Sequence, residues 1–221
     1  MSERRTVPRV DRERQMVDVA SRLFGERGFQ AVSMDEIAGA VGVTKPVLYT
    51  HFGSKEGLYV SCLARLAEPL VKHVQEAVDP GEPPERQLWA GLRAFFDFIA
   101  IERERWAALV VQVPPQGPET AAQIARARAR VHAALTALLV RAAADVGVTP
   151  DLSEEIELQA HALLGACESL AAYAVRHPEV PADVLALQLM NFAWRGFEAL
   201  LQGRLWLPDG RGSPRERPSM P

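Results

Sequence analysis

The sequence predicts an all-α protein with a small N-terminal three-helix unit and a larger helical body. Apolar residues recur at the three- and four-residue spacing that marks one face of a helix. No segment is a convincing strand, and proline-containing stretches such as 79–84 break the helical pattern. We therefore expect an N-terminal arm and head over residues 1–56, a helical body over 57–207, and a disordered tail over 208–221.

Composition narrows the class of protein. The 221 residues are 48% apolar and 24% charged, which is ample for a packed core and ordinary for a soluble protein. The two cysteines, Cys62 and Cys167, lack the spacing of a metal site or a disulfide framework, which favours a reducing cytoplasm. We expect neither a secretory signal nor a membrane span, and no metal or other cofactor. Residues 1–56 carry a net charge of +1 and the remainder −4, so only the N-terminal part suits a polyanion.

The helices expected in the head have recognisable start and stop signals. The first runs from Asp11 to Arg27 and ends at Gly28. Ser33 can cap the second helix, because Glu36 follows three residues later and completes a capping box. Gly42 comes just after the last apolar residue of that helix, where a left-handed backbone suits glycine.

A third short helix follows after a tight turn. Thr44 can cap this helix, and Pro46 lies in its first turn, where a missing N–H costs nothing. Two short helices joined in this way form a helix-turn-helix, whose second helix can enter the major groove of DNA.

Long helices are expected to build the body. Ser54 is placed to cap the first of them, which runs toward Val78 with a bend at Pro69. Further helical segments are expected at about 85–112 with an interruption near Arg103, at 119–146, at 153–177 and at 181–204.

Three stretches of the head occur in a fixed order and spacing. They are FGERGF at Phe24–Phe29, SMDEIAGAVGVT at Ser33–Thr44, and LYTHFGSKEGL at Leu48–Leu58. This pattern, which covers about a quarter of the chain, resembles the DNA-binding domain of the TetR family of bacterial transcriptional regulators. The resemblance implies a homodimer whose two heads bind a palindromic double-stranded DNA operator. It also implies a body that receives a small-molecule effector, which lowers the DNA affinity of what is most commonly a repressor.

Residues of the helix-turn-helix can be assigned chemical roles beside this resemblance. Lys45, at the N-terminal end of the recognition helix, is the first candidate for a guanine contact, with a phosphate contact or a solvated surface position as alternatives. Pro46 and Val47 can offer only apolar contacts, for which a thymine methyl is the natural partner. The hydroxyl and imidazole groups of the helix are expected to contact phosphates. The expected DNA-binding residues are Ser33, Thr44, Lys45, Pro46, Val47, Tyr49, Thr50, His51 and Lys55.

Five arginines are expected ahead of the first helix, at Arg4, Arg5, Arg9, Arg12 and Arg14. They could form a basic arm along the adjacent minor groove or backbone, or a solvated tail.

The body offers candidates for an effector pocket, which we expect to take a hydrophobic or flat aromatic ligand. Aromatic rings could line it or be plain core, and polar side chains could orient the ligand or be satisfied elsewhere. The pocket candidates are Trp89, Phe95, Phe96, Phe98, Trp106, Gln112, His132, His161 and Glu168.

The last two helices are expected to form the dimer by four-helix packing across a two-fold axis, with packing inside the chain as the alternative. The interface candidates are Leu164, Gly165, Ala172, Leu185, Leu189, Phe192 and Gly196.

Two other functions compete with the regulator. One is an all-helical enzyme, which the absence of a nucleophile-and-base set or a phosphate-binding loop in the sequence makes unattractive. The other is a structural DNA-binding protein without an effector, which the large body disfavours.

Overall fold

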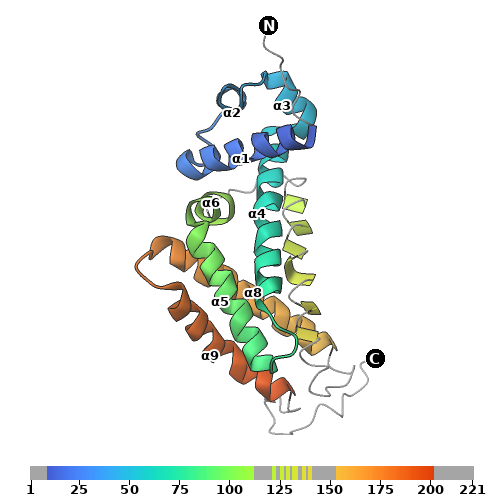
Figure 1. The fold of residues 1–221 in the computed structure, drawn as a ribbon, viewed down its shortest axis with the longest axis vertical. Helices are drawn as coiled ribbons and strands as arrows, with labels where there is room; N and C mark the ends of the chain where they lie inside the picture. The colour runs from blue at the N-terminus through green and yellow to red at the C-terminus, as the bar shows by residue number, and fades with distance from the viewer. Residues whose placement is uncertain are drawn as a thin grey trace, which may run out of the picture.

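Figure 1 shows the computed structural model, which describes residues 9–111, 153–201 and part of 121–140. No strand occurs among these described residues, so the expected all-α class is confirmed. None of the described helices is long and apolar enough to cross a membrane. The helices are α1 (Arg9–Arg27), α2 (Met34–Val41), α3 (Lys45–Phe52), α4 (Lys55–Ala77), α5 (Pro84–Ile101), α6 (Arg103–Trp106), the π-helical turn η1 (Ala107–Val111), α8 (Ser153–Arg176) and α9 (Ala182–Leu201).

The helix boundaries agree closely with the sequence signals. The expected interruption near Arg103 is present, because α5 ends at Ile101 and α6 starts two residues later. The α4 helix continues through Pro69 to Ala77. The described residues between 121 and 140 are helical, whereas the rest of the expected 119–146 helix and the tail at 208–221 lie outside the described residues.

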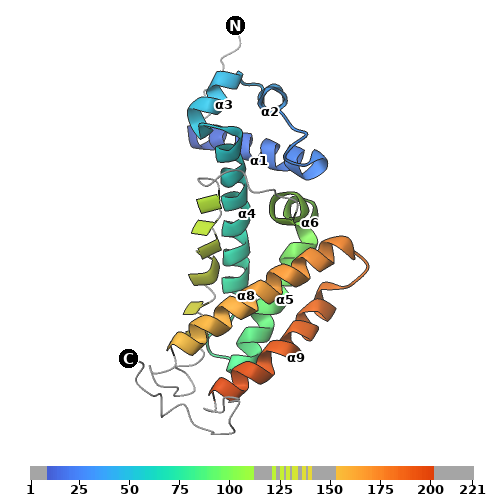
Figure 2. The same cartoon turned by 180° about the vertical axis from the view of Figure 1, so that it is seen from behind.

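The head consists of α1, α2 and α3, which sit at one end of the long helix α4 (Figure 1). The α5 helix packs against α4 and against α9, while α8 contacts α5 and α9. Figure 2 shows α8 and α9 together on the far face. The α1 helix contacts α4 and also α6 and η1, so the head rests on the body through more than one element.

One continuous hydrophobic cluster runs from Met16 in α1 to Phe197 in α9. Its centre in the head is an aromatic group in which the ring centroids of Phe24 and Phe29 lie 5.4 Å apart, and those of Phe29 and Tyr59 5.1 Å apart. Because Tyr59 belongs to α4, this group joins the head to the body.

A glycine fixes the junction between α3 and α4. Gly57 lies in the first turn of α4, and a Cβ atom built there would overlap the carbonyl oxygen of Phe52 at the end of α3. Only glycine allows so close an approach of two backbones. The junction thereby sets how α3 is carried on α4.

Candidate functional site

The α2–turn–α3 unit is closed by the hydrogen bonds that its sequence predicts. The hydroxyl of Ser33 accepts a hydrogen bond from the backbone N–H of Glu36 at 3.2 Å, and the backbone N–H of Ser33 donates to the Glu36 carboxylate at 2.8 Å. Gly42 has a left-handed backbone with φ of 78°, and its N–H donates to the carbonyl oxygen of Ala38 at 2.9 Å. The capping box and the glycine turn are thus both confirmed.

The capping box also lowers the pKa of the Glu36 carboxyl group. The backbone N–H of Ser33 and the Arg27 guanidinium, which lies 2.7 Å from the carboxylate, lower the pKa of Glu36 to about 2. Both groups favour the charged form of the carboxylate. This ion pair joins the last residue of α1 to the first turn of α2.

The N-terminal end of α3 differs from expectation in one respect. Thr44 lies at the cap position with an extended backbone, but its side chain makes no capping hydrogen bond. Pro46 lies in the first turn as expected, which leaves few donors there for a cap to satisfy. The hydroxyl of Thr50 donates to the carbonyl oxygen of Pro46 at 2.8 Å, while the ring of Tyr49 is 43% exposed.

Lys45 makes an ion pair that sequence inspection did not identify. Its ammonium lies 2.8 Å from the carboxylate of Asp35, in the first turn of α2. This contact raises the pKa of Lys45 above its ordinary value, since the hydrogen bond and the charge of Asp35 both favour the protonated form. Asp35 and Lys45 are ten residues apart, so only the fold of the turn brings them together.

Besides Ser33, Lys45 and Thr50, three more of the expected DNA-binding residues make contacts within the chain. Val47 packs partly against the core. The His51 side chain is only 13% exposed, and its Nδ1 lies 3.8 Å from the Glu13 carboxylate. The ammonium of Lys55 lies 4.3 Å above the ring of Phe29, and partial burial lowers its pKa.

The basic arm is shorter than the sequence suggested. Because α1 begins at Arg9, the arginines Arg12 and Arg14 lie on the first turns of this helix and are exposed there. Arg4 and Arg5 lie outside the described residues.

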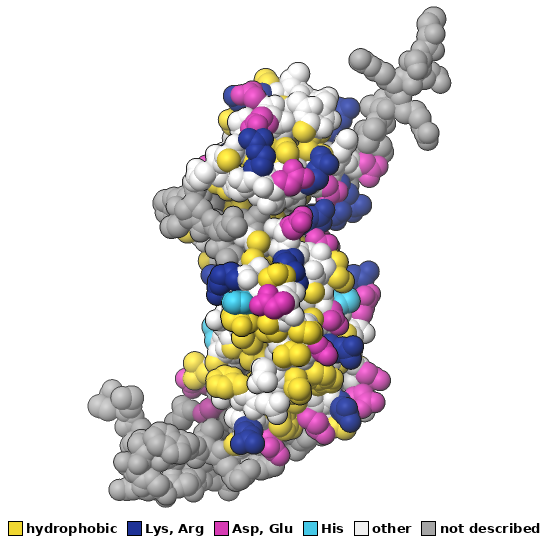
Figure 3. All heavy atoms as spheres, turned by 90° about the vertical axis from the view of Figure 1, so that its left-hand side faces the viewer, with side chains coloured by type: hydrophobic (Ala, Val, Ile, Leu, Met, Phe, Trp, Pro, Cys, Tyr) yellow, Lys and Arg dark blue, Asp and Glu magenta, His cyan; other side chains and the backbone are white. Residues whose placement is uncertain are grey.

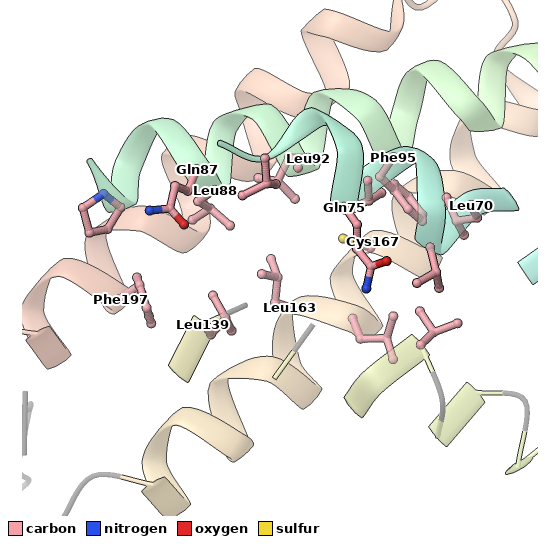
Figure 4. Close-up of a pocket in the computed structure, with 17 residues that line it drawn as sticks. Leu70, Gln75, Gln87, Leu88, Leu92, Phe95, Leu139, Leu163, Cys167 and Phe197 are labelled. Atoms are coloured by element: carbon pink, nitrogen blue, oxygen red, sulfur yellow. The ribbon is translucent and has the colours of Figure 1, made fainter. Parts of the chain in front are cut away.

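The body contains two adjoining cavities between α4, α5, α8 and the described residues of 121–140. The larger has a volume of about 420 Å³ and extends from Tyr59 and Trp106 near the head; the smaller has about 90 Å³ and reaches Pro84 and Phe197 at the far end. Figure 4 shows the smaller cavity, with side chains from several helices converging on it. The two cavities share the lining residues Leu70, Phe95, Val131 and Leu164.

The expected pocket residues divide into four groups. Phe95, Trp106 and Glu168 do line a cavity. Phe96, Phe98 and Trp89 pack in or against the hydrophobic core and are absent from both linings. His132 and His161 contact each other, and Gln112 lies outside the described residues.

The polar candidates are held by contacts between α8 and the 121–140 segment. Glu168 forms a two-pronged ion pair with Arg128, with both N–O distances at 3.0 Å. The rings of His132 and His161 lie 3.5 Å apart between centroids, and Nδ1 of His161 is 3.1 Å from the carbonyl oxygen of Glu157. No group of three or more potential metal ligands occurs among the described residues.

Part of the expected dimer stripe faces inward. Leu185 and Leu189 are buried in the core of their own chain, and Leu164 lines both cavities. Phe192 is 78% exposed, and Gly165 and Gly196 are exposed, with open space where a Cβ would lie. Ala172 is half-buried.

Further exposed apolar side chains on α8 and α9 accompany Phe192. Figure 3 shows hydrophobic side chains gathered over the lower half of the molecule, on the side where α9 lies. The large exposed ones on the two helices are Leu158, Tyr173, Val184, Leu187 and Phe192. We call this set the α8–α9 face.

Several cavity residues were not singled out from the sequence. Tyr59 lines the larger cavity, and its buried hydroxyl donates a hydrogen bond to the carbonyl oxygen of Leu109 in η1. Cys167 lines the smaller cavity, and burial raises the pKa of its thiol to about 12. An apolar stripe on α4 with period 3.6, which includes Leu66 and Leu70, was a usable signal for the wall that α4 forms.

The head and the body each match a known family description. Residues 16–62 match "Bacterial regulatory proteins, tetR family", and residues 84–196 match "Tetracyclin repressor-like, C-terminal domain".

Curated relatives include two mycobacterial regulators. The chain is 39% identical over 118 residues to the HTH-type transcriptional activator FasR of Mycolicibacterium smegmatis, a match that covers 53% of this chain and 54% of that protein. It thus spans only about half the length of that relative. It is 27% identical over 184 residues to the HTH-type transcriptional regulator EthR of the same organism, covering 80% of this chain and 82% of EthR.

A solved structure is similar over nearly its whole length. A TetR-like transcriptional regulator from Rhodococcus sp. RHA1 is 34% identical, with a TM-score of 0.64, and the match covers 87% of this chain and 98% of that one.

Proposed function

Since this chain belongs to the TetR family of bacterial transcriptional regulators, we propose that it is a homodimeric, effector-responsive regulator of transcription in the bacterial cytoplasm. In this proposal residues 1–56 bind a palindromic operator, and residues 57–207 bind the effector and form the dimer. The observation that carries the proposal is the capped α2–turn–α3 unit, which leaves the N-terminal end of α3 exposed for the major groove.

The DNA-binding half is tested by selecting bound duplexes from a random pool. A symmetric dimer should select two half-sites about one helical turn, or a multiple of it, apart. Lys45→Ala should then weaken binding to the selected duplex by about 1–3 kcal/mol if the lysine contacts a guanine.

The matched control is Lys72→Ala, because this lysine is exposed on α4 and pairs with Glu76. Failure of the wild-type protein to enrich any sequence would remove the proposed function. Equal affinities of the wild type and Lys45→Ala would remove only the base contact of Lys45.

The effector half rests on the two adjoining cavities. Their linings follow α4 from Tyr59 to Gln75, a span of about 24 Å at 1.5 Å per helical residue. Apolar side chains make up most of this lining, while Arg128 and Glu168 supply a polar group on one wall. We therefore propose that the effector is an elongated, largely apolar molecule.

Thermal melting with simple probes tests this shape. Dodecanoic acid and dodecanol should raise the melting temperature, since a ligand that binds only the folded state stabilises it by about 2.7 kcal/mol at 100 times its dissociation constant. A compact polar probe such as glucose should leave it unchanged. An effector shifts the protein only if it binds the DNA-free conformation more tightly than the DNA-bound one. A compound that raises the melting temperature and is the effector should therefore also release the selected duplex.

The dimer half rests on the α8–α9 face. Phe192→Asp and Gly165→Trp should each give monomers by analytical ultracentrifugation and lose affinity for the palindromic duplex. Ile101→Asp is the control, because Ile101 is also exposed and apolar but lies at the end of α5. If Phe192→Asp and Gly165→Trp remain dimeric, the interface is placed wrongly.

The direction of regulation is proposed to be repression, which is the commoner mode in the family. Activation is the second candidate, because the relative FasR is named an activator. Transcription in vitro from a promoter that carries the selected duplex distinguishes the two: added protein lowers the transcript in one case and raises it in the other.

A further inference from the structure

The α2–α3 unit carries little free positive charge in the absence of DNA. Besides His51, the basic side chains of residues 33–55 are two lysines, Lys45 and Lys55. Lys45 is paired with Asp35 at 2.8 Å, and Lys55 lies over the ring of Phe29. A helix-turn-helix that depends on contacts with an anionic polymer thus holds each of these cations in an internal contact.

The Lys45–Asp35 pair is a poor candidate for a structural support. The two side chains are 45% and 68% exposed, and ion pairs at such positions contribute about 0–1 kcal/mol to stability. The start of α2 is already closed by Ser33 and Glu36. The position of the pair, at the N-terminal ends of both helices of the motif, suggests a role toward DNA instead.

Asp35 should act differently on the two kinds of DNA contact. Phosphate contacts give sequence-independent affinity, because each one releases condensed counterions. A lysine that is already neutralised by a carboxylate supplies little of that attraction, and the carboxylate itself is repelled by phosphates. A guanine edge offers two acceptors in a fixed geometry, so it can replace Asp35 as the partner of Lys45 only at the right base.

From this geometry we infer that Asp35 is a specificity-determining residue. It holds Lys45 away from phosphates, so that the lysine contributes at the operator and contributes little on other DNA. The inference rests on the proposed DNA-binding function and adds to it a residue that does not itself contact the bases.

The test compares Asp35→Asn with wild type on two probes, a 30-base-pair duplex of random sequence and the duplex selected by the wild-type protein. Asp35→Asn should bind the random duplex several-fold more tightly, with a smaller gain on the selected duplex. The slope of log K against log salt on the random duplex should steepen by about 0.9 for each head, which corresponds to one more phosphate contact.

Three further variants separate this effect from general ones. Glu26→Gln removes one carboxylate from an exposed position in α1 and should not alter the ratio of the two affinities. Asp35→Glu keeps the charge and should retain the wild-type ratio. In the Lys45→Ala background, Asp35→Asn should give a much smaller gain on the random duplex than it gives in the wild type, because only the direct repulsion between Asp35 and phosphates is then relieved.

The outcomes separate this inference from the function on which it rests. The inference is overturned if Asp35→Asn changes binding to neither probe, if it changes both equally, or if its gain on the random duplex is as large in the Lys45→Ala background as in the wild type. It is also overturned if Glu26→Gln produces the same gain. A wild-type protein that binds neither probe contradicts the proposed function instead.

Discussion

The head and the body are built from helices of similar kind, but they differ in how completely their interiors are filled. In the head, Phe24 and Leu48 are fully buried among close neighbours. In the body, Leu70 and Phe95 are also nearly buried, yet both border cavities. The difference shows that burial alone does not describe a site, because a side chain can be shielded from water and still have space beside it.

This difference has a physical reason in each region. The head must present α3 in one orientation, and close packing together with glycine contacts holds a backbone in one arrangement. Under the proposed function the body must bind an effector, and the effector needs space that the side chains of the protein do not fill. The same hydrophobic cluster serves both purposes because α4 passes through the two regions.

The largest expected effect is the loss of a ring from the filled region. Phe24→Ala should lower the free energy of unfolding by about 3–5 kcal/mol, because the space cannot collapse. Phe95→Ala should lower the free energy of unfolding by less, by about 3 kcal/mol at most, since part of its surface already faces a cavity. Urea denaturation at neutral pH measures both. A larger cost for Phe95→Ala would contradict the distinction between the two regions.

A smaller effect is expected when a side chain is enlarged. Leu48→Phe should destabilise the protein by about 1–3 kcal/mol, because the head has no room for it. Leu70→Phe should be nearly neutral, because its extra atoms can enter the cavities, and it should weaken binding of dodecanoic acid. The two variants carry the same substitution, so equal losses of stability would show that the body is not hollow beside Leu70.

The smallest expected effect concerns acid. The pKa of Glu36 is near 2 in the folded protein against an ordinary value of 4.5, so its charged form stabilises the fold above about pH 4.5. This contribution is lost as the pH falls toward 2. Melting temperatures of Glu36→Gln should therefore fall less steeply between pH 5 and 3 than those of the wild type. Ser33→Ala should show only a small change in the same direction, because the backbone N–H of residue 33 and Arg27 still contact the carboxylate. An unchanged slope in Glu36→Gln would contradict this account.

Local signals explain why the head could be predicted well. Residues that cap a helix make their hydrogen bonds to neighbours only a few positions away in the sequence. Ser33 and Glu36 at the start of α2, and Gly28 and Gly42 after α1 and α2, could therefore be assigned from spacing alone. Thr44 was placed correctly, but its missing hydrogen bond depends on where the side chain turns. The Gly57 contact was missed, because it depends on the end of a different helix.

The cavities could be predicted only in outline. Phe95 and Trp106 were correctly identified as lining residues. The sequence pattern did not distinguish them from Phe96 and Phe98, which are buried in the core and line neither cavity. Leu164 was assigned to the dimer because its stripe is apolar, a property that the wall of a cavity shares. Which face meets which neighbour is decided by helices far apart in the chain, and periodicity does not contain that information.

The Lys45–Asp35 contact illustrates the same limit on a smaller scale. Both residues lie within the most informative stretch of the sequence, and each has an ordinary local role. Their pairing needs the tight turn at Gly42 to bring two helix starts together.

The contacts of α1 have a consequence for anyone who wishes to reuse the head. Met16, Val17 and Phe24 are buried in the cluster that continues into α4, and α1 also touches α6 and η1. A fragment cut after α3 would leave this apolar surface bare, and would lose the Tyr59 ring from its aromatic group. The head is therefore not an independent folding unit. A chimera that borrows its DNA preference must also contain the N-terminal half of α4, together with residues that replace the contacts of α6 and η1 with α1.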